Sequence, residues 1–234
     1  VFKIPLTWII QEDGMGYFTT AYSFYSPVYS LAAAGFPVAI SRMVSLHTAE
    51  KRYGDVRQVH RVSIPVFLCT GTLGMAAMLA GAWWYTAAVG NPGAIYCMLA
   101  LAPAVLFSCL SSVYRGYYEG LRNMAPTAIS EILEALCRLV LGLSAAWEIL
   151  DWGLKEYRAH GTVLGNAVDS LAEARAYLLP LSAAGAIVGV TIGAIVSFLF
   201  LLLRHRLRGD GISPAMLSRA PKPASGKKTA LELI

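Results

Sequence analysis

Long apolar runs separated by short polar segments dominate the chain. About 20 helical residues, rising about 1.5 Å each, cross the hydrocarbon core of a bilayer. Runs of at least that length cover residues 15–40, 63–86, 94–114, 125–147 and 177–203. The pattern therefore predicts an all-α polytopic membrane protein with five full spans.

A shorter apolar run, VFKIPLTWII at residues 1–10, precedes the polar QEDG. Ten helical residues cover only about half of the hydrocarbon core. We expect this run to be a partial span, the surviving end of a longer first helix that is truncated here. The chain would then hold five full spans and one truncated span.

Composition narrows the class of protein. Of the 234 residues, 56% are hydrophobic and only 14% are charged, whereas about a quarter of a typical soluble domain is charged. A disordered chain would be polar and highly charged, so that class is excluded. The low charge also disfavours a soluble nucleic-acid-binding protein, although the net charge is +5. The expected partner is the lipid bilayer, not nucleic acid.

Basic and non-basic segments alternate between the spans. Residues 41–62, 115–124 and 204–234 are rich in lysine and arginine. Residues 87–93 carry no charge, and in 148–176 acidic residues outnumber basic ones. Cytoplasmic loops carry the excess of lysine and arginine. We therefore expect a multi-pass protein of the cytoplasmic membrane with 41–62, 115–124 and the C-terminal tail on the cytoplasmic side.

Two loops have patterns of their own. Residues 45–60 (SLHTAEKRYGDVRQVH) are mostly polar and predict a short cytoplasmic helix interrupted near Gly54. In residues 162–176, Leu164, Val168 and Leu171 recur at helical spacing, opposite acidic side chains. That spacing predicts a short helix on the outer membrane surface.

Composition changes again at the end of the last span. The membrane lobe is expected to cover residues 1–208. Residues 209–234 contain several prolines and a GKK run, which are typical of a flexible linker. We expect this linker to lie in the cytoplasm.

Charged residues inside the span at 125–147 are the strongest functional signal. A charge in hydrocarbon is costly unless it is paired or hydrated. Glu131, Glu134 and Arg138 are three and four residues apart, so they share one helical face. This face is expected to line a protein interior or an aqueous cavity. It would form either the wall of a substrate or ion path, or an ion pair that locks the helix to a neighbour.

The span at 15–40 carries a tyrosine stripe. Tyr22, Tyr25 and Tyr29 follow Phe18 at helical offsets. Their hydroxyls need hydrogen-bond partners within the membrane. The stripe therefore predicts either aromatic packing or a polar cavity. Pro27 and the Gly35-Phe36-Pro37 sequence are expected to loosen or bend this helix.

Arginines also mark the predicted cytoplasmic ends of the spans. Arg115 opens the segment RGYYEGLRNMAP, and Arg42 follows the span at 15–40. Guanidinium groups present planar donors suited to phosphate. These residues either contact a phosphate-bearing substrate or anchor the helices at the interface.

Motifs of known catalytic chemistry do not occur in the sequence. It contains no H-E-x-x-H, G-x-S-x-G, P-loop or dinucleotide fingerprint. The four cysteines lie in apolar runs without a C-x-x-C pair, so disulfides and zinc sites are not expected. The four histidines are scattered outside the spans, as is usual for solvated residues. We expect no enzyme, no metal and no cofactor.

Several segments together resemble a known family. They are GFPVAISRMVS (35–45), GNP (90–92), the stretch at 101–143, and AAGAIVGVTIGA (183–194). The most specific is RGYYEGLRNMAPTAISEI at 115–132. The chain resembles the stage V sporulation protein B-like branch of polysaccharide flippases, within the multidrug/oligosaccharidyl-lipid/polysaccharide exporter superfamily. The resemblance covers nearly all of residues 1–208.

This resemblance implies a fold and a function. The chain would be the six-helix N-terminal lobe of a MATE-like, flippase-like transporter, and the C-terminal lobe of the same chain would be missing. Such a protein flips a lipid-linked oligosaccharide or peptidoglycan precursor across the membrane by alternating access, here in spore cortex formation. The implied substrate is a sugar linked to undecaprenyl pyrophosphate.

Membrane depth assigns roles to three arginines under this interpretation. Arg138 would hold the pyrophosphate inside the membrane, with Arg42 and Arg115 at the cytoplasmic mouth. Two alternatives remain. In a Na⁺- or H⁺-coupled multidrug antiporter of the same superfamily, Glu131 or Glu134 would bind the ion. A membrane scaffold for cell-wall synthesis would transport nothing.

Overall fold

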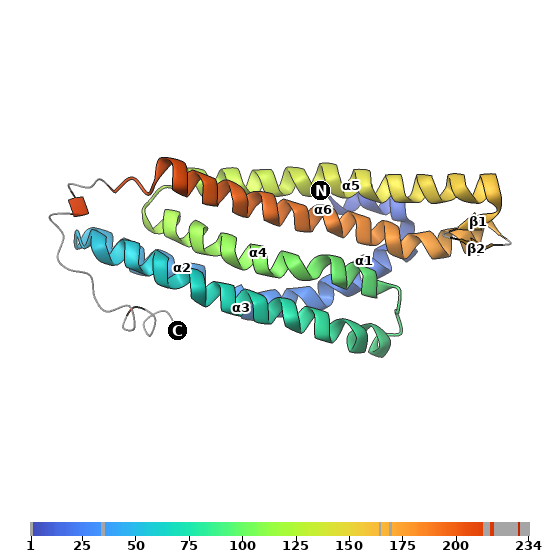
Figure 1. The fold of residues 1–234 in the computed structure, drawn as a ribbon, viewed down its shortest axis with the longest axis horizontal. Helices are drawn as coiled ribbons and strands as arrows, with labels where there is room; N and C mark the ends of the chain where they lie inside the picture. Colours follow the sequence, from blue (N-terminus) through green and yellow to red (C-terminus); the bar gives the residue numbers. More distant parts are fainter. Residues whose placement is uncertain are drawn as a thin grey trace. The chain divides into compact units, whose positions relative to one another are not determined.

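The fold is almost entirely helical. The structure, a computed structural model, describes residues 2–33, 36–163, 165–168, 170–212, 216–217 and 229. Its long helices are α1 (Lys3–Ala33), α2 (Phe36–Ala49), α3 (Tyr53–Ala88), α4 (Ala94–Gly120), α5 (Ala125–His160) and α6 (Leu171–Arg208). The strands β1 (Thr162–Val163) and β2 (Asn166–Ala167) form an antiparallel hairpin between α5 and α6 (Figure 1).

Helices of membrane-spanning length and hydropathy recur along the chain. Within the described residues, four helical runs qualify: Lys3–Ala49, Tyr53–Ala88, Ala94–Gly120 and Leu171–Arg208. The protein is therefore an all-α, multi-pass membrane protein. Helix α5 contains the predicted span 125–147 but does not qualify, because charged residues interrupt its apolar stretch. That α5 crosses the membrane stays a prediction.

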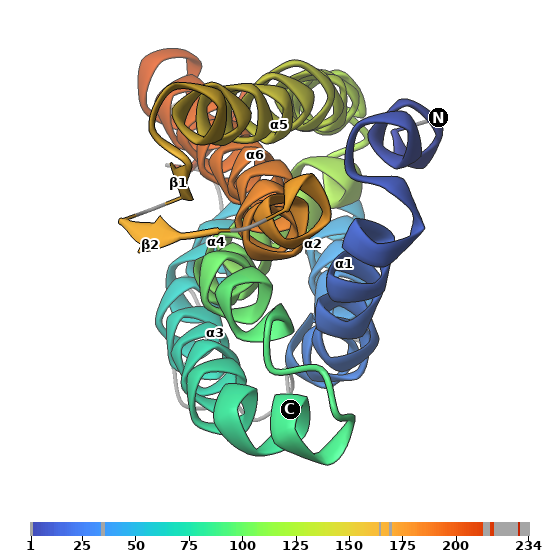
Figure 2. The ribbon, with the colours of Figure 1, turned by 90° about the vertical axis from the view of Figure 1, so that its right-hand side faces the viewer.

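The first apolar run ends where the sequence predicts, whereas the second is divided. Gln11, the first residue of the polar QEDG, has non-helical angles (φ 58°, ψ −170°), so two helical segments of α1 meet at a kink there. Figure 2 shows the change of direction near the start of α1. The run at 15–40 is predicted as one span, but α1 ends at Ala33 and α2 begins at Phe36. Pro37 fits the first turn of α2, where its missing N–H leaves no hydrogen bond unmade.

The helix at 45–60 is interrupted a few residues before the position predicted near Gly54. Helix α2 ends at Ala49, and α3 begins at Tyr53, so Gly54 is inside the first turn of α3. Lys51 adopts a left-handed conformation (φ 58°), and this residue reverses the chain between the two helices. A non-glycine residue in that conformation carries no strong sequence signal.

The predicted surface helix at 162–176 is wrong. Residues 162–163 and 166–167 form the hairpin, and α6 begins only at Leu171. Gly161 and Gly165 have φ values of 65° and 81°, which favour turns and oppose a continuous helix. Val163 and Val168 are buried against side chains of α5 and α6. Of that prediction, Leu164 and Asp169 lie outside the described residues.

The predicted linker at 209–234 is described only in part. Its prolines and the GKK run lie outside the described residues, as does Gly35 of the predicted Gly35-Phe36-Pro37 break. Residues 209–212 are described, and Gly209 and Asp210 line a polar pocket.

The chain divides into two compact units. The first comprises residues 1–28, 75–104 and 134–193, and the second comprises 29–74, 105–133 and 194–234. Five of the helices contribute residues to both units.

In the first unit, α5 and α6 approach until their backbones touch. A Cβ atom placed on Gly189 would overlap the backbone N and Cα of Gly142. A hydroxyl adds to this contact, since Ser182 Oγ donates a hydrogen bond to the carbonyl of Ala146 at 2.7 Å. Small residues at four-residue spacing are the usual means by which membrane helices pack this closely.

The second unit repeats this packing between α2 and α4. A Cβ atom on Gly116 would lie 2.6 Å from the carbonyl oxygen of Pro37, and one on Gly120 would lie 2.6 Å from Cβ of Val44. The two glycines are four residues apart in RGYYEG. The most specific segment of the sequence therefore has a packing role: it lets α4 lie against α2.

Replacing Gly189 with alanine tests the α5–α6 contact. Because the added methyl has no room against the backbone of Gly142, we expect the Gly189→Ala variant to lose about 1–3 kcal/mol of stability. The measurement is the thermal unfolding midpoint of the purified chain in detergent micelles.

Gly16→Ala is the matched control. Gly16 also lies in a helix of the first unit, but a Cβ atom there would meet nothing within 4 Å. Alanine is the better helix former, so this variant should unfold at or slightly above the wild-type midpoint. Equal midpoints for the two variants would show that α5 and α6 are not in backbone contact.

Candidate functional site

A polar cluster in the first unit joins α1 to α5. It consists of Tyr22, Glu134 and Arg138, and we call it the Arg138 cluster. Arg138 Nη2 donates a hydrogen bond to Glu134 Oε1 at 3.0 Å, one turn apart on α5. Tyr22 of α1 lies within electrostatic range of both side chains. The tyrosine stripe of α1 and the charged face of α5, which the sequence predicts independently, are thus near each other at Tyr22.

The arginine of this cluster keeps unused binding capacity. The side chains of Arg138 and Glu134 are 35% and 20% exposed. Arg138 Nε is buried and has no hydrogen-bond partner among the described residues. A buried N–H without a partner is costly, so a ligand oxygen at this atom would be stabilising. The guanidinium is paired with the Glu134 carboxylate and still has an unused N–H donor at Nε. It is therefore suited to bind a second anion besides Glu134.

The tyrosine stripe of α1 forms an aromatic wall beside the cluster. Phe18 stacks on Tyr22 with ring centroids 4.6 Å apart, and Tyr25 meets Tyr22 edge-on at 5.7 Å. Tyr25 belongs to the first unit, whereas Tyr29 belongs to the second. The two interpretations of the stripe therefore coexist at Tyr22, which both packs and faces charged groups.

Arg115 connects three helices of the second unit. Its Nε donates to Ser130 Oγ at 3.2 Å, and its Nη2 donates to Ser197 Oγ at 2.9 Å. Its Nη1 lies 3.9 Å from Glu131 Oε1. Arg115 is thus held by α5 and α6, which favours the anchoring role over a free phosphate-binding group.

Glu131 and Arg42 are the most exposed of the predicted site residues. The Glu131 side chain is 61% exposed, and Arg115 of α4 is its ion-pair partner. Arg42 is exposed on α2, and its side chain makes no hydrogen bond or ion pair with any residue that the structure describes. A role for Arg42 at a cytoplasmic mouth stays a prediction.

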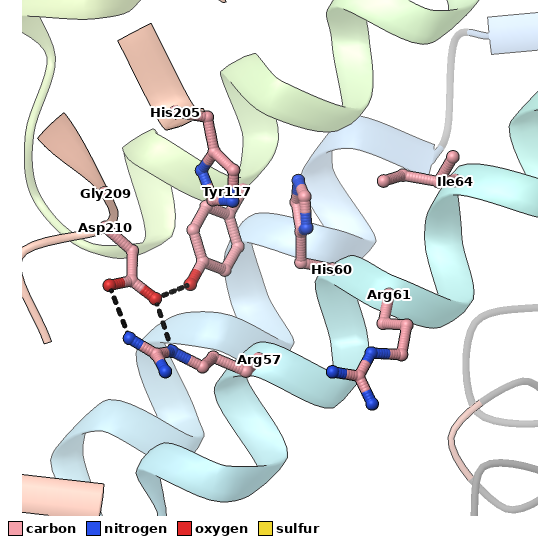
Figure 3. A pocket seen from close by; sticks show the side chains of 8 residues that line it. All are labelled: Arg57, His60, Arg61, Ile64, Tyr117, His205, Gly209 and Asp210. Atoms are coloured by element: carbon pink, nitrogen blue, oxygen red, sulfur yellow. Dashed lines mark hydrogen bonds and ion pairs between the residues drawn. The ribbon is translucent and has the colours of Figure 1, made fainter. Parts of the chain in front are cut away.

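A second polar site, in the second unit, was missed by sequence reasoning. Its lining comes from the first turns of α3, the last turns of α4 and the end of α6, and we call it the Asp210 pocket (Figure 3). The lining residues are Arg57, His60, Arg61, Ile64, Tyr117, His205, Gly209 and Asp210. The sequence predicts solvated histidines and a linker at Asp210, but His60 is buried and Asp210 is hydrogen-bonded to α3 and α4.

Asp210 is the centre of this pocket. Arg57 donates to it twice, from Nε to Oδ2 at 2.8 Å and from Nη2 to Oδ1 at 3.1 Å. The Tyr117 hydroxyl donates to Oδ2 at 3.1 Å, and the Ile212 N–H donates to Oδ1 at 3.1 Å. Asp210, two residues beyond the end of α6, is therefore hydrogen-bonded to α3 and α4.

These hydrogen bonds keep Asp210 ionised. Partial burial alone would raise the pKa of its carboxyl, because burial disfavours the charged form. The hydrogen bonds from Arg57, Ile212 and Tyr117 outweigh burial and hold the pKa below its ordinary value. Asp210 therefore remains a negatively charged partner of Arg57 at neutral pH.

Among the described residues, there is no group of three or more histidine, cysteine, aspartate or glutamate side chains placed to hold a metal ion. The chemistry available at both sites is the binding of charged groups by arginine, histidine and tyrosine.

Comparison with curated sequences gives three relatives in Bacillus subtilis (strain 168). Stage V sporulation protein B is 29% identical over 176 residues, which are 73% of this chain and 33% of that protein. The lipid II flippase MurJ is 28% identical over 159 residues, 64% of this chain and 29% of that protein. The uncharacterized membrane protein YabM is 23% identical over 173 residues, 72% of this chain and 32% of that protein.

The chain thus spans about a third of the length of these relatives. No solved structure matches it significantly. The sequence model of the family described as "Polysaccharide biosynthesis protein" matches residues 1–209. That match takes in α1 to α6 and the Arg138 cluster, so the chain belongs to the polysaccharide biosynthesis protein family.

Proposed function

We propose that the chain is part of a flippase that carries a lipid-linked oligosaccharide or peptidoglycan precursor across the cytoplasmic membrane. The single observation that carries this proposal is the Arg138 cluster, an arginine with an unpartnered buried N–H on a helix of a multi-pass membrane protein. The names of two relatives, a lipid II flippase and a stage V sporulation protein, support the class of substrate and a role in spore cortex formation.

The proposed reaction moves a substrate and changes no covalent bond. Arg138 would bind the diphosphate of an undecaprenyl-pyrophosphate-linked sugar, while the lipid tail stays in hydrocarbon. Alternating access would then expose the bound head group first to one side of the membrane and then to the other. A second lobe of the same protein would supply the opposite wall of the cavity.

The pairing of Glu134 favours this function over a cation-coupled drug antiporter. An ion site needs a carboxylate that is free to bind Na⁺ or H⁺. Glu134 is already charge-compensated by Arg138 at 3.0 Å, and this leaves the cluster without excess negative charge. Glu131 likewise has an arginine, Arg115, within 3.9 Å.

The proposed architecture is the six-helix N-terminal lobe of a MATE-like transporter, with α5 inserted and its charges turned away from lipid. The proposed orientation places segments 41–62 and 115–124 and the tail in the cytoplasm. The Asp210 pocket supports this orientation. Arg57, Tyr117 and Asp210 come from those three segments, and Arg57 and Tyr117 both donate hydrogen bonds to Asp210, as expected for segments on one side of the membrane.

Charge reversal at Arg138 tests the transport proposal. In the protein at its natural length, Arg138→Glu should lower export of the lipid-linked sugar about tenfold or more, because a charge-assisted contact to the diphosphate is lost. The milder Arg138→Gln variant should show the same direction of change. Export is measured in liposomes that contain the reconstituted protein and a labelled lipid-linked precursor.

Arg158→Glu is the matched control, because Arg158 is an exposed arginine near the end of the same helix. It should leave export unchanged. Wild-type export by both Arg138 variants would contradict the proposal. Loss of ion-coupled drug efflux in Glu134→Gln would instead support the antiporter. If variants that neutralise Glu131, Glu134 and Arg138 had no phenotype, the scaffold would be supported.

Cysteine labelling tests the orientation. In a background without the native cysteines, Asn123→Cys lies in the exposed turn between α4 and α5, and Val89→Cys lies at the exposed end of α3. A membrane-impermeant maleimide added to intact cells should label position 89 and spare position 123. Permeabilised cells provide the control, since both positions should then react. The opposite pattern in intact cells would invert the proposed topology.

A further inference from the structure

The Asp210 pocket has the size and lining of a binding site that the proposed transport cycle does not use. Its volume is about 450 Å³. Figure 3 shows Arg57 and His60 on α3 facing Tyr117 and Asp210 across the pocket. Every lining residue belongs to the second unit, and none of them belongs to the Arg138 cluster.

The lining has an excess of positive charge. It contains the guanidinium groups of Arg57 and Arg61 and the carboxylate of Asp210. Arg57 is neutralised by the two hydrogen bonds to Asp210. Arg61 is exposed, and its side chain has no hydrogen bond or ion pair with the part of the chain that the structure describes. One guanidinium at the pocket is therefore available to a ligand.

Two imidazoles add unused polar atoms. The rings of His60 and His205 stack with centroids 4.5 Å apart. His60 Nε2 and His205 Nδ1 are buried, and neither has a hydrogen-bond partner among the described residues. His60 is only 8% exposed. A side chain this buried normally has its polar atoms satisfied, so the unpartnered nitrogen points to a missing ligand.

The ligand that fits this pocket is an anion. A cation would need a free carboxylate, but both oxygens of Asp210 already accept hydrogen bonds from Arg57, Tyr117 and the Ile212 N–H. An anion needs donors, which Arg61 and an imidazole N–H supply. Phosphate oxygens match the planar donors of arginine and offer acceptors in several directions at once.

We propose that the Asp210 pocket binds a phosphate-bearing anion, held by the Arg61 guanidinium and by imidazole N–H groups of His60 and His205. The Arg57–Asp210 pair forms one wall of the site and keeps α3, α4 and α6 in place around it. The ligand is a phosphate or diphosphate ester, carried either by a water-soluble compound or by a lipid head group. The site does not rest on the transport proposal and would stand if export were shown to be absent.

Binding of inorganic pyrophosphate to the 234-residue chain tests the soluble source. We expect saturable binding by isothermal titration calorimetry in detergent micelles, with the dissociation constant raised about tenfold in Arg61→Gln, because a charge-assisted contact is removed. Since Arg61 is exposed, this variant should fold normally. His60→Gln provides a second variant from the buried side of the pocket.

Bilayers of stated composition test the lipid source. In phosphatidylcholine nanodiscs, added phosphatidic acid should raise the unfolding temperature of the wild-type chain and leave that of Arg61→Gln unchanged. Arg122→Gln is the matched control for both arms, because Arg122 is an exposed arginine of the second unit that does not line the pocket.

Each outcome decides the proposal. Arg61-dependent binding of pyrophosphate assigns a soluble phosphate, and an Arg61-dependent response to phosphatidic acid alone assigns a lipid head group. The absence of binding in both arms would overturn the proposal. An equal loss of binding in Arg61→Gln and Arg122→Gln would overturn it as well, because it would indicate non-specific attraction to positive charge.

Discussion

A polar group in hydrocarbon has no water to bind, and this constraint shapes nearly every feature of the chain. Backbone groups satisfy it by forming helices, which account for most of the described residues. Hydroxyl groups satisfy it within or between helices: Ser63 Oγ donates to the carbonyl of Val59 at 2.8 Å, and Thr191 Oγ1 donates to that of Ala100 at 2.6 Å. The charged side chains of α5 are likewise paired, Arg138 with Glu134 and Glu131 with Arg115 of α4.

The same constraint explains why most of the architecture could be predicted from the sequence. Hydropathy alone located the apolar runs that lie in α3, α4 and α6. It failed where backbone conformation decides the outcome. The helical spacing of Val168 and Leu171 predicted a helix, but glycines at 161 and 165 adopt positive φ and close a hairpin instead. The kink at Gln11, by contrast, coincides with the polar QEDG that ends the first apolar run, so this boundary had a hydropathy signal.

The two sites differ in how far the sequence could reveal them. Glu134 and Arg138 are four residues apart on one helix, so their pairing follows from helical geometry, and only the approach of Tyr22 required the fold. The Asp210 pocket had no such local pattern. Arg57 and Asp210 are 153 residues apart in sequence, and a histidine or aspartate near the end of a span looks solvated when taken singly. The charge alternation between loops predicts that their segments share one membrane face, and this orientation stays a prediction.

The backbone contact between Gly142 and Gly189 bears on how the first unit can move. Two helices that touch through their main chains have no layer of side chains between them to absorb sliding or rotation. Helices α5 and α6 are therefore expected to travel together as one rigid body in this unit. Helix α1 already departs from helical geometry at Gln11, so we expect any bending of α1 to occur at that residue.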